Sequence, residues 1–259
     1  MKHIESLGSL ALATALAWAA GCASQPAKPT PQPAVRHEEP TAPPPVGNAE
    51  LKITLPPGAA QAPAPFEGDG WEAMNDGQDL DGWREIPFAG HGQVRCQAGA
   101  IVLGMGDPFT GITCTNDCPR MNYEVALDAM RLMGSDFFCG LTVPIGDTFC
   151  SLIVGGWGGS LVGISSLDGM DASENETSKF VTFESGRWYR IRLRVTEKRI
   201  QAWIDKNKLV DVTTSERKIG LRSGDIEMCK PFGVAAWQTS SALREMKLRR
   251  VSGPAGKGE

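Results

Sequence analysis

The sequence predicts an all-β protein, a sandwich of two antiparallel sheets, and three observations lead to that prediction. From Trp71 onward the hydrophobic pattern has a period of two residues, which places alternate side chains on opposite faces of a strand. About a dozen such segments are separated by Gly, Pro, Asn or Asp, the residues that turns prefer. No long stretch shows the period of an amphipathic helix. Many short strands with frequent turns pack as sandwiches or barrels.

The first 21 residues have the composition of an export signal. Lys2 gives a positive start, and residues 7–20 are apolar or small, a run too short to span a bilayer comfortably. The run ends in Ala19-Ala20-Gly21-Cys22, which resembles the lipobox of bacterial lipoproteins. We therefore expect a lipoprotein signal over residues 1–21 and a lipidated Cys22 that anchors the protein in the cell envelope, at the outer membrane. An ordinary secretory signal is the alternative.

Residues 22–65 have the composition of a linker. Twelve of the 18 prolines lie between Gln25 and Pro65, and large apolar residues are almost absent there. Such a segment cannot offset its loss of conformational entropy by burial, so we expect it to be extended and disordered. Apart from Trp18, all aromatic residues lie further along the chain. We therefore place the folded domain at residues 66–252 and a disordered tail at 253–259.

The strands can be located from the alternation, in chain order. Residues 123–128 alternate, and residues 136–143 and 148–154 form two more apolar runs joined by a Pro-Ile-Gly-Asp turn. Residues 188–196 give the clearest pattern, because Tyr, Ile, Leu and Val share one face and three arginines share the other. After this strand we expect a hairpin, closed by an Asp-Lys-Asn-Lys turn, and a last strand: residues 200–205, 208–212 and 246–251.

Six cysteines remain in the domain when Cys22 is set aside. An even number in an exported protein favours disulfides over metal ligands, and no Cys-x-x-Cys pair suggests zinc. Cys114 and Cys118 could close a local bridge. Cys139 and Cys150 lie at similar distances from the turn between their strands, so they could face each other across a hairpin. Free cysteines packed as small hydrophobic side chains are the alternative for each pair.

Several motifs together resemble one known family. Residues 75–83, Asn-Asp-Gly-Gln-Asp-Leu-Asp-Gly-Trp, resemble the opening motif of the 3-keto-disaccharide hydrolase domain family. Three later stretches are similar, in the same order, to the strands that close that domain: residues 186–195, 199–211 and 242–250. The resemblance covers roughly residues 66–251. It implies a concanavalin A-like jelly roll, in which two antiparallel sheets form one concave face.

The resemblance also implies a reaction. A ketone at C3 of a glycoside acidifies the proton at C2, so a base can remove it, an electrophile can stabilise the enolate, and an acid can assist departure of the oxygen at C1. Four carboxylates within nine residues are the candidates: Asp168, Asp171, Glu174 and Glu176. They would also suffice for a divalent cation, although the spacing is not that of an EF-hand, and no other cofactor is expected. A solvated polar loop is the alternative.

The candidate substrate-binding residues are aromatic, amide and arginine side chains. Trp157 lies between two pairs of glycines, which leaves its indole open to a sugar ring unless the turn folds it onto the core. Asn175 belongs to the carboxylate-rich segment. Trp203 has the phase of the polar face of its strand, so it is exposed unless a bulge turns it inward. Arg190 and Arg192 could bind a hydroxyl-rich ligand, or be solvated.

The net charge and the histidine content exclude some classes of partner and of active site. The net charge of −4 gives no basic surface, which argues against nucleic acid as a partner. His91 is the one histidine beyond residue 65, so sites built on two histidines are excluded there, and without a Gly-x-Ser-x-Gly motif we expect it in a surface loop. The sequence therefore predicts a lipid-anchored envelope protein with a carbohydrate ligand, and the family resemblance implies that it cleaves 3-keto-glycosides. A noncatalytic carbohydrate-binding or adhesion module is the alternative.

Overall fold

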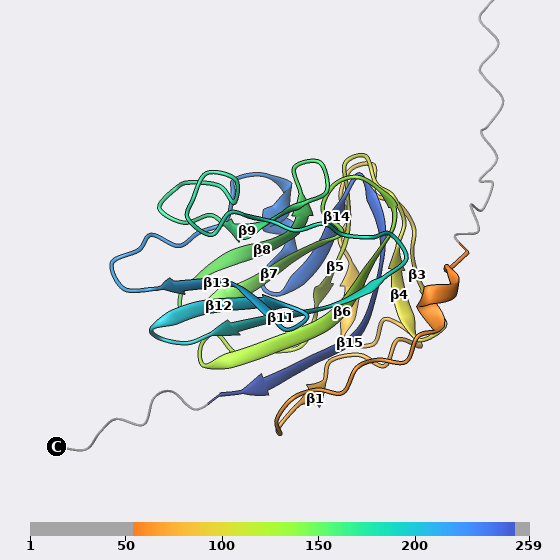
Figure 1. The fold of residues 1–259 in the computed structure, drawn as a ribbon, viewed down its shortest axis with the longest axis horizontal. Helices are drawn as coiled ribbons and strands as arrows, with labels where there is room; N and C mark the ends of the chain where they lie inside the picture. Colours follow the sequence, from red (N-terminus) through yellow and green to blue (C-terminus); the bar gives the residue numbers. More distant parts are fainter. Residues whose placement is uncertain (1–53, 252–259) are drawn as a thin grey trace, which may run out of the picture. The chain divides into compact units, whose positions relative to one another are not determined.

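The computed structural model describes residues 54–251, which form two antiparallel sheets packed face to face (Figure 1). The predicted all-β jelly-roll sandwich is confirmed. Within residues 54–251 the helical segments are two short 3-10 turns, η1 (Pro57–Ala60) and η2 (Asp225–Cys229). No helix in this part of the chain is long and apolar enough to cross a membrane. The predicted leader, Cys22, the first part of the linker and the tail lie outside the described residues.

The first sheet has the strand order β13-β12-β11-β6-β15-β4-β3, with β1 paired to β15. Its longest strands, β6 and β15, lie side by side at its centre. The strands are β1 (Glu72–Ala73), β3 (Val94–Gln97), β4 (Ala100–Leu103), β6 (Tyr123–Gly134), β11 (Trp188–Val195), β12 (Arg199–Ile204), β13 (Asn207–Thr213) and β15 (Thr239–Arg250).

The second sheet has the order β10-β9-β8-β7-β14-β5-β2. Strands β7, β8 and β9 form consecutive hairpins, while β14 inserts between β7 and β5 from far along the chain. The strands are β2 (Trp83–Glu85), β5 (Phe109–Cys114), β7 (Cys139–Ile145), β8 (Thr148–Gly156), β9 (Leu161–Ser165), β10 (Lys179–Phe180) and β14 (Gly233–Trp237).

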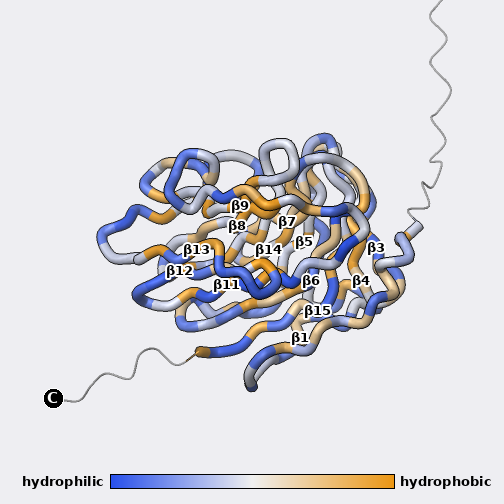
Figure 2. Tube along the Cα trace, viewed as in Figure 1, coloured by the Kyte–Doolittle hydropathy of each residue, from blue (hydrophilic) through white to orange (hydrophobic). Residues whose placement is uncertain are grey.

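The main core lies between the two sheets and is built from alternate side chains. Ile191 and Leu193 of the first sheet meet Leu141 and Leu152 of the second, and all four are fully buried. Each such side chain contributes about 1.5–3 kcal/mol to folding. The Tyr123 hydroxyl donates a hydrogen bond across the core to the carbonyl of Pro144, at 2.5 Å. Figure 2 shows hydrophobic residues along the strands and hydrophilic residues at many of the turns.

The folded chain begins earlier than predicted, because the last part of the expected linker lies on the first sheet. We call residues 54–65 the strap. Its Ala59 side chain packs against the apolar cluster that contains Trp188, and the Ala59 carbonyl accepts a hydrogen bond from the Trp188 indole at 3.3 Å. Arg244 donates to the Gln61 carbonyl at 2.6 Å. The prolines mark this segment as a linker by composition, but its backbone carbonyls still accept hydrogen bonds, and these hold it in place.

All six cysteines in the described part of the chain are free thiols. The pairing of Cys139 with Cys150 across the hairpin is wrong, because the β7–β8 register places Cys139 opposite Val154. Both side chains are buried as small hydrophobic groups, and burial raises the pKa of the Cys150 thiol to about 12. Cys114 and Cys118 do lie together, and the hydrogen bond from Cys118 lowers the pKa of the Cys114 thiol to about 7.

Candidate functional site

A cleft with two lobes opens on the outer face of the second sheet, among the loops that follow β8, β9 and β13. The polar lobe, about 570 Å³, is lined mainly by Ser166, Ser173, Glu174 and Lys218. The apolar lobe, about 480 Å³, is lined mainly by Phe109, Phe137, Ile153, Ile226 and Trp237. Trp157, Asp171, Arg222 and Ser223 border both lobes. Each volume is within the range usual for small-molecule sites.

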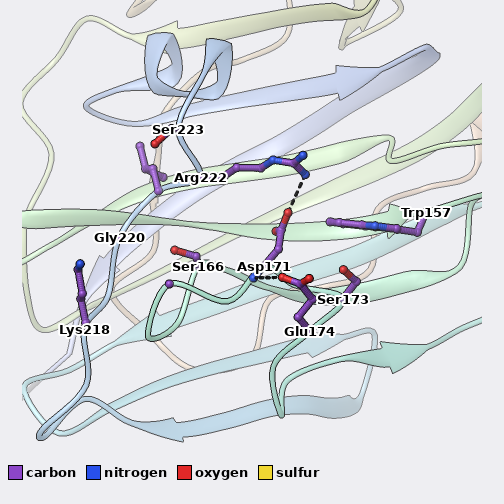
Figure 3. Close-up of a pocket in the computed structure, with 11 residues that line it drawn as sticks. Trp157, Ser166, Asp171, Ser173, Glu174, Lys218, Gly220, Arg222 and Ser223 are labelled. Atoms are coloured by element: carbon purple, nitrogen blue, oxygen red, sulfur yellow. Dashed lines mark hydrogen bonds and ion pairs between the residues drawn. The ribbon is translucent and has the colours of Figure 1, made fainter. Parts of the chain in front are cut away.

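Asp171 and Arg222 form an ion pair at the junction of the two lobes (Figure 3). The guanidinium lies 2.6 Å from one carboxylate oxygen of Asp171. The other oxygen accepts hydrogen bonds from the Ser165 hydroxyl at 2.6 Å and the Ala172 amide at 2.7 Å. With both oxygens occupied, Asp171 is suited to orient Arg222 rather than to take a proton. The Arg222 side chain is 65% exposed, which leaves further N–H groups for a ligand.

Glu174 is the second carboxylate of the cleft. It is exposed in the polar lobe, and within residues 54–251 its carboxylate has one hydrogen bond, accepted from the Asp171 amide at 3.2 Å. It can therefore act as a base more readily than Asp171 can. The hydroxyls of Ser166 and Ser173 and the Lys218 ammonium line the same lobe, and in the part of the chain that the structure describes these three groups make no side-chain hydrogen bond or ion pair.

Trp157 lies at the tip of the β8–β9 turn, with its side chain 42% exposed at the junction of the lobes. Its backbone adopts a φ of 47°, a left-handed conformation that non-glycine residues rarely take and that is common at functional sites. Arg131 of β6 supports the turn from below and donates to the Gly159 carbonyl at 2.6 Å. A Cβ on Gly155 would lie 2.7 Å from the Arg131 guanidinium. The glycines therefore permit this close approach, and the indole projects outward.

The other two predicted carboxylates do not line the cleft. Asp168 and Glu176 both bind Arg217, at 2.7 Å and 2.6 Å. The predicted substrate-binding Asn175 is buried, and its amide group donates to the carbonyls of Ile164 and Asp171 at 2.8 Å and 2.7 Å. Asn175 therefore fixes the shape of the loop. Among residues 54–251, no group of three or more His, Cys, Asp and Glu could hold a metal ion, and the divalent cation stays a prediction.

Arg190, Arg192 and Trp203 lie on the outer face of the first sheet, on the opposite side of the sandwich from the cleft. Arg190 binds the buried carboxylate of Asp128 at 2.5 Å, and Arg192 binds that of Glu124 at 3.1 Å. The Arg192 guanidinium stacks 4.3 Å from the centre of the Trp203 ring. These three side chains are occupied in a structural network, so the structure does not bring them to the candidate site.

Several residues of the cleft could not be predicted from the sequence. Arg222 and Lys218 lie in the loop after β13, which has neither periodicity nor a motif. Phe137 and Trp237 lie at the ends of distant segments that meet only in the fold, where the Trp237 amide donates to the Phe137 carbonyl at 3.0 Å. A weak signal for this loop is the short Gly-Leu-Arg-Ser-Gly sequence around Arg222, because glycines on both sides of an arginine are typical of a turn that presents a side chain. His91 is in an exposed loop, as predicted, and does not line either lobe.

Solved structures with related folds share little sequence with this chain. A candidate glycosyl hydrolase from Parabacteroides distasonis is 12% identical, with a TM-score of 0.45, over 71% of this chain and 94% of its own. The carbohydrate-binding module CBM66 from Bacillus subtilis is 11% identical, with a TM-score of 0.42, over 65% and 95%. Domain 4 of an extracellular arabinanase from Geobacillus stearothermophilus, solved with arabinotriose, is 13% identical, with a TM-score of 0.45, over 71% and 93%.

The family assignment comes from the sequence as a whole. No curated protein matches this chain. Residues 70–249 match the model of a family described as the 3-keto-alpha-glucoside-1,2-lyase-like domain, in agreement with the resemblance seen in the motifs. This range includes nearly all strands of both sheets and the whole cleft. The chain therefore belongs to the family of 3-keto-alpha-glucoside-1,2-lyase-like domains, a family of carbohydrate-active proteins.

Proposed function

We propose that this domain cleaves 3-keto-glycosides at the bond between C1 and the glycosidic oxygen. One observation carries the proposal: Asp171, Glu174, Arg222 and Trp157 line one cleft. Together they offer a carboxylate base, a cationic hydrogen-bond donor and a ring on which a sugar can stack. Membership of the lyase-like family supports the same class of substrate.

In the proposed reaction Glu174 takes the proton from C2 of the 3-keto sugar. The electron pair of the C–H bond moves onto the C3 oxygen, and Arg222, held by Asp171, stabilises the resulting enolate. When the C3 carbonyl reforms, the C1–O bond breaks and a C1=C2 double bond forms. The proton held by Glu174 passes to the departing oxygen, which leaves as an alcohol. Addition of water across the double bond then gives the free 3-keto sugar.

Turnover of a 3-keto-α-disaccharide by the purified protein tests this proposal. Glu174→Gln removes the base and should lower kcat by about 100-fold or more. Glu176→Gln changes a carboxylate of the same loop that binds Arg217 outside the cleft, and should keep kcat within about twofold. If the wild type is inactive but binds the sugar, the noncatalytic binding module becomes the better account. The feature that favours this second candidate is the full occupation of the Asp171 carboxylate, which leaves Glu174 to serve as both base and acid.

We also propose that the protein is anchored in the cell envelope by a lipid on Cys22. The apolar run followed by Ala-Ala-Gly-Cys supports this assignment. The test is expression of the full chain in a Gram-negative host with labelled palmitate. The wild type should carry label and sediment with the membranes, because two or three acyl chains anchor durably. Cys22→Ser should be unlabelled, and an unlabelled, soluble wild type would contradict the proposal.

A further inference from the structure

We propose that the apolar lobe binds the leaving group of the substrate, and that this group is an apolar ring rather than a second sugar. The inference rests on the proposed function, since it assigns the two lobes of the cleft to the two halves of a 3-keto-glycoside. The substrate would then be a 3-keto-glycoside of an aryl or aryl-alkyl alcohol.

The polar lobe is suited to the sugar ring because its wall carries unused hydrogen-bonding groups. The hydroxyls of Ser166, Ser173 and Ser223 and the ammonium of Lys218 make no side-chain hydrogen bond or ion pair within residues 54–251 (Figure 3). A hydroxyl-rich ring that leaves water needs partners of this kind. Glu174, the proposed base, lines the same lobe, so the acidified C2 proton would be placed beside it.

The apolar lobe has a different floor. It is formed by part of what we call the outer-face cluster, the apolar residues on the outer face of the second sheet that include Phe109, Phe137 and Ile153 with Trp237 packed against them. Phe109 and Trp237 pack edge to face with ring centres 4.6 Å apart. Phe137 and Ile153 complete the floor, and Ile226 of η2 closes one side. Trp237 is only partly buried, so one part of its ring is available to a ligand. An aromatic or alkyl ring placed there would bury apolar surface that water otherwise covers, and this burial favours binding.

Three polar side chains next to the floor of the apolar lobe are already occupied. The Ser151 hydroxyl shares a hydrogen bond of 2.7 Å with Thr142, and the Ser165 hydroxyl donates to Asp171 at 2.6 Å. One oxygen of Asp136 accepts from the Phe137 amide at 2.7 Å. A second sugar would bring several hydroxyls into this lobe, and each one buried without a partner weakens binding by roughly tenfold. An apolar ring carries no such penalty. Within residues 54–251 the lobe's free side-chain groups with charge or hydroxyl, on Arg222, Ser223 and Asp225, belong to exposed residues of the segment after β13, while the floor itself is apolar and favours a ring.

The junction between the lobes fits the position of the bond that breaks. Trp157 and the Asp171–Arg222 pair border both lobes. A substrate with its sugar in the polar lobe and its leaving group in the apolar lobe would therefore place C1 and the glycosidic oxygen beside Arg222 and Trp157.

The test uses three 3-keto-α-glucosides with methyl, benzyl and glucosyl leaving groups and the full chain. The benzyl group is chosen because benzyl alcohol is nearly as weak an acid as methanol, so a difference reports the ring and not leaving-group acidity. We measure kcat/KM for the wild type and Kd for the inactive Glu174→Gln variant. The benzyl glycoside should exceed both others by about tenfold or more in each measurement.

Two variants locate the effect. Trp237→Leu should remove most of the preference for benzyl over methyl, while Lys218→Ala, in the polar lobe, should weaken all three ligands by the same factor. The ratio measured on the wild type needs no variant, so misfolding of Trp237→Leu would not prevent a decision. A benzyl-to-methyl ratio near one, or a preference for the disaccharide, overturns this inference and leaves the proposed function intact. Absence of cleavage and binding for all three overturns both.

Discussion

Arg131 is a buried cation whose hydrogen-bond partners are neutral. It is 7% exposed, donates to the carbonyls of Gly155 and Gly159, and lies over the ring of Phe138 at 5.2 Å. Burial lowers the pKa of its guanidinium. A charge buried without a paired carboxylate is costly, and such cost is often retained at functional sites. The two carbonyls lie on either side of Trp157 in the sequence. We therefore infer that the role of Arg131 is to hold the turn that positions this indole.

Replacing Arg131 should weaken ligand binding but leave the free energy of unfolding almost unchanged. Arg131→Met keeps the volume but leaves the turn of Trp157 without its donors, so the affinity for a 3-keto-glycoside should fall by about tenfold. The free energy of unfolding should change by less than about 1 kcal/mol, because replacing a poorly compensated buried charge by an apolar side chain is often neutral. Calorimetric titration and urea unfolding measure the two quantities. Arg131→Lys, which keeps one donor, should recover part of the affinity.

The control is Arg194→Met on the opposite face of the sandwich. Arg194 binds Glu124 at 2.9 Å, so this variant should lose stability and keep its affinity for the ligand. If Arg131→Met bound the ligand as well as the wild type does, Arg131 would have no part in positioning Trp157.

At the scale of the elements, alternation identified the strands that have one polar face. From Tyr189 onward, strand β11 alternates buried and partly exposed residues, and the prediction of residues 188–196 matches the strand closely. Strands β5 and β14 are almost fully buried on both faces, because the core covers one face and the outer-face cluster with its loops covers the other. Such strands have no alternation to detect. The sequence pattern therefore found the first sheet better than the second.

The parts of the site that could be predicted are likewise those with a local pattern in the sequence. The density of carboxylates pointed to the loop after β9, and Asp171 and Glu174 of that loop do line the cleft. The pattern does not say which of the carboxylates turn outward, and the fold directs Asp168 to Arg217 instead. Arg222 and Trp237 reach the cleft through a loop and through the insertion of β14 between β5 and β7. Contacts that depend on strand order leave no mark in local sequence.

At the scale of the whole sandwich, the two outer faces are covered in different ways. On the first sheet, the fully buried Glu124 binds the guanidinium groups of Arg192, Arg194 and Arg249, and the strap crosses the same face. Three cations around one carboxylate compensate the loss of its hydration. On the second sheet, loops leave the cleft open. The outer face of the first sheet is therefore covered by the ion-pair network and the strap, and the candidate ligand-binding site lies on the outer face of the second sheet.

This division predicts what removal of the strap should do. A chain that starts at Phe66 exposes Trp188 and removes the carbonyl of Gln61 that Arg244 binds, so it should be less stable by about 2–4 kcal/mol than a chain that starts at Thr54. Its affinity for a 3-keto-glycoside should stay within about twofold, because the cleft lies on the other face. Urea unfolding and calorimetric titration of the two chains measure both quantities. Equal stability would show that the strap contributes nothing to folding, and a parallel loss of affinity would show that the two faces are coupled through the core.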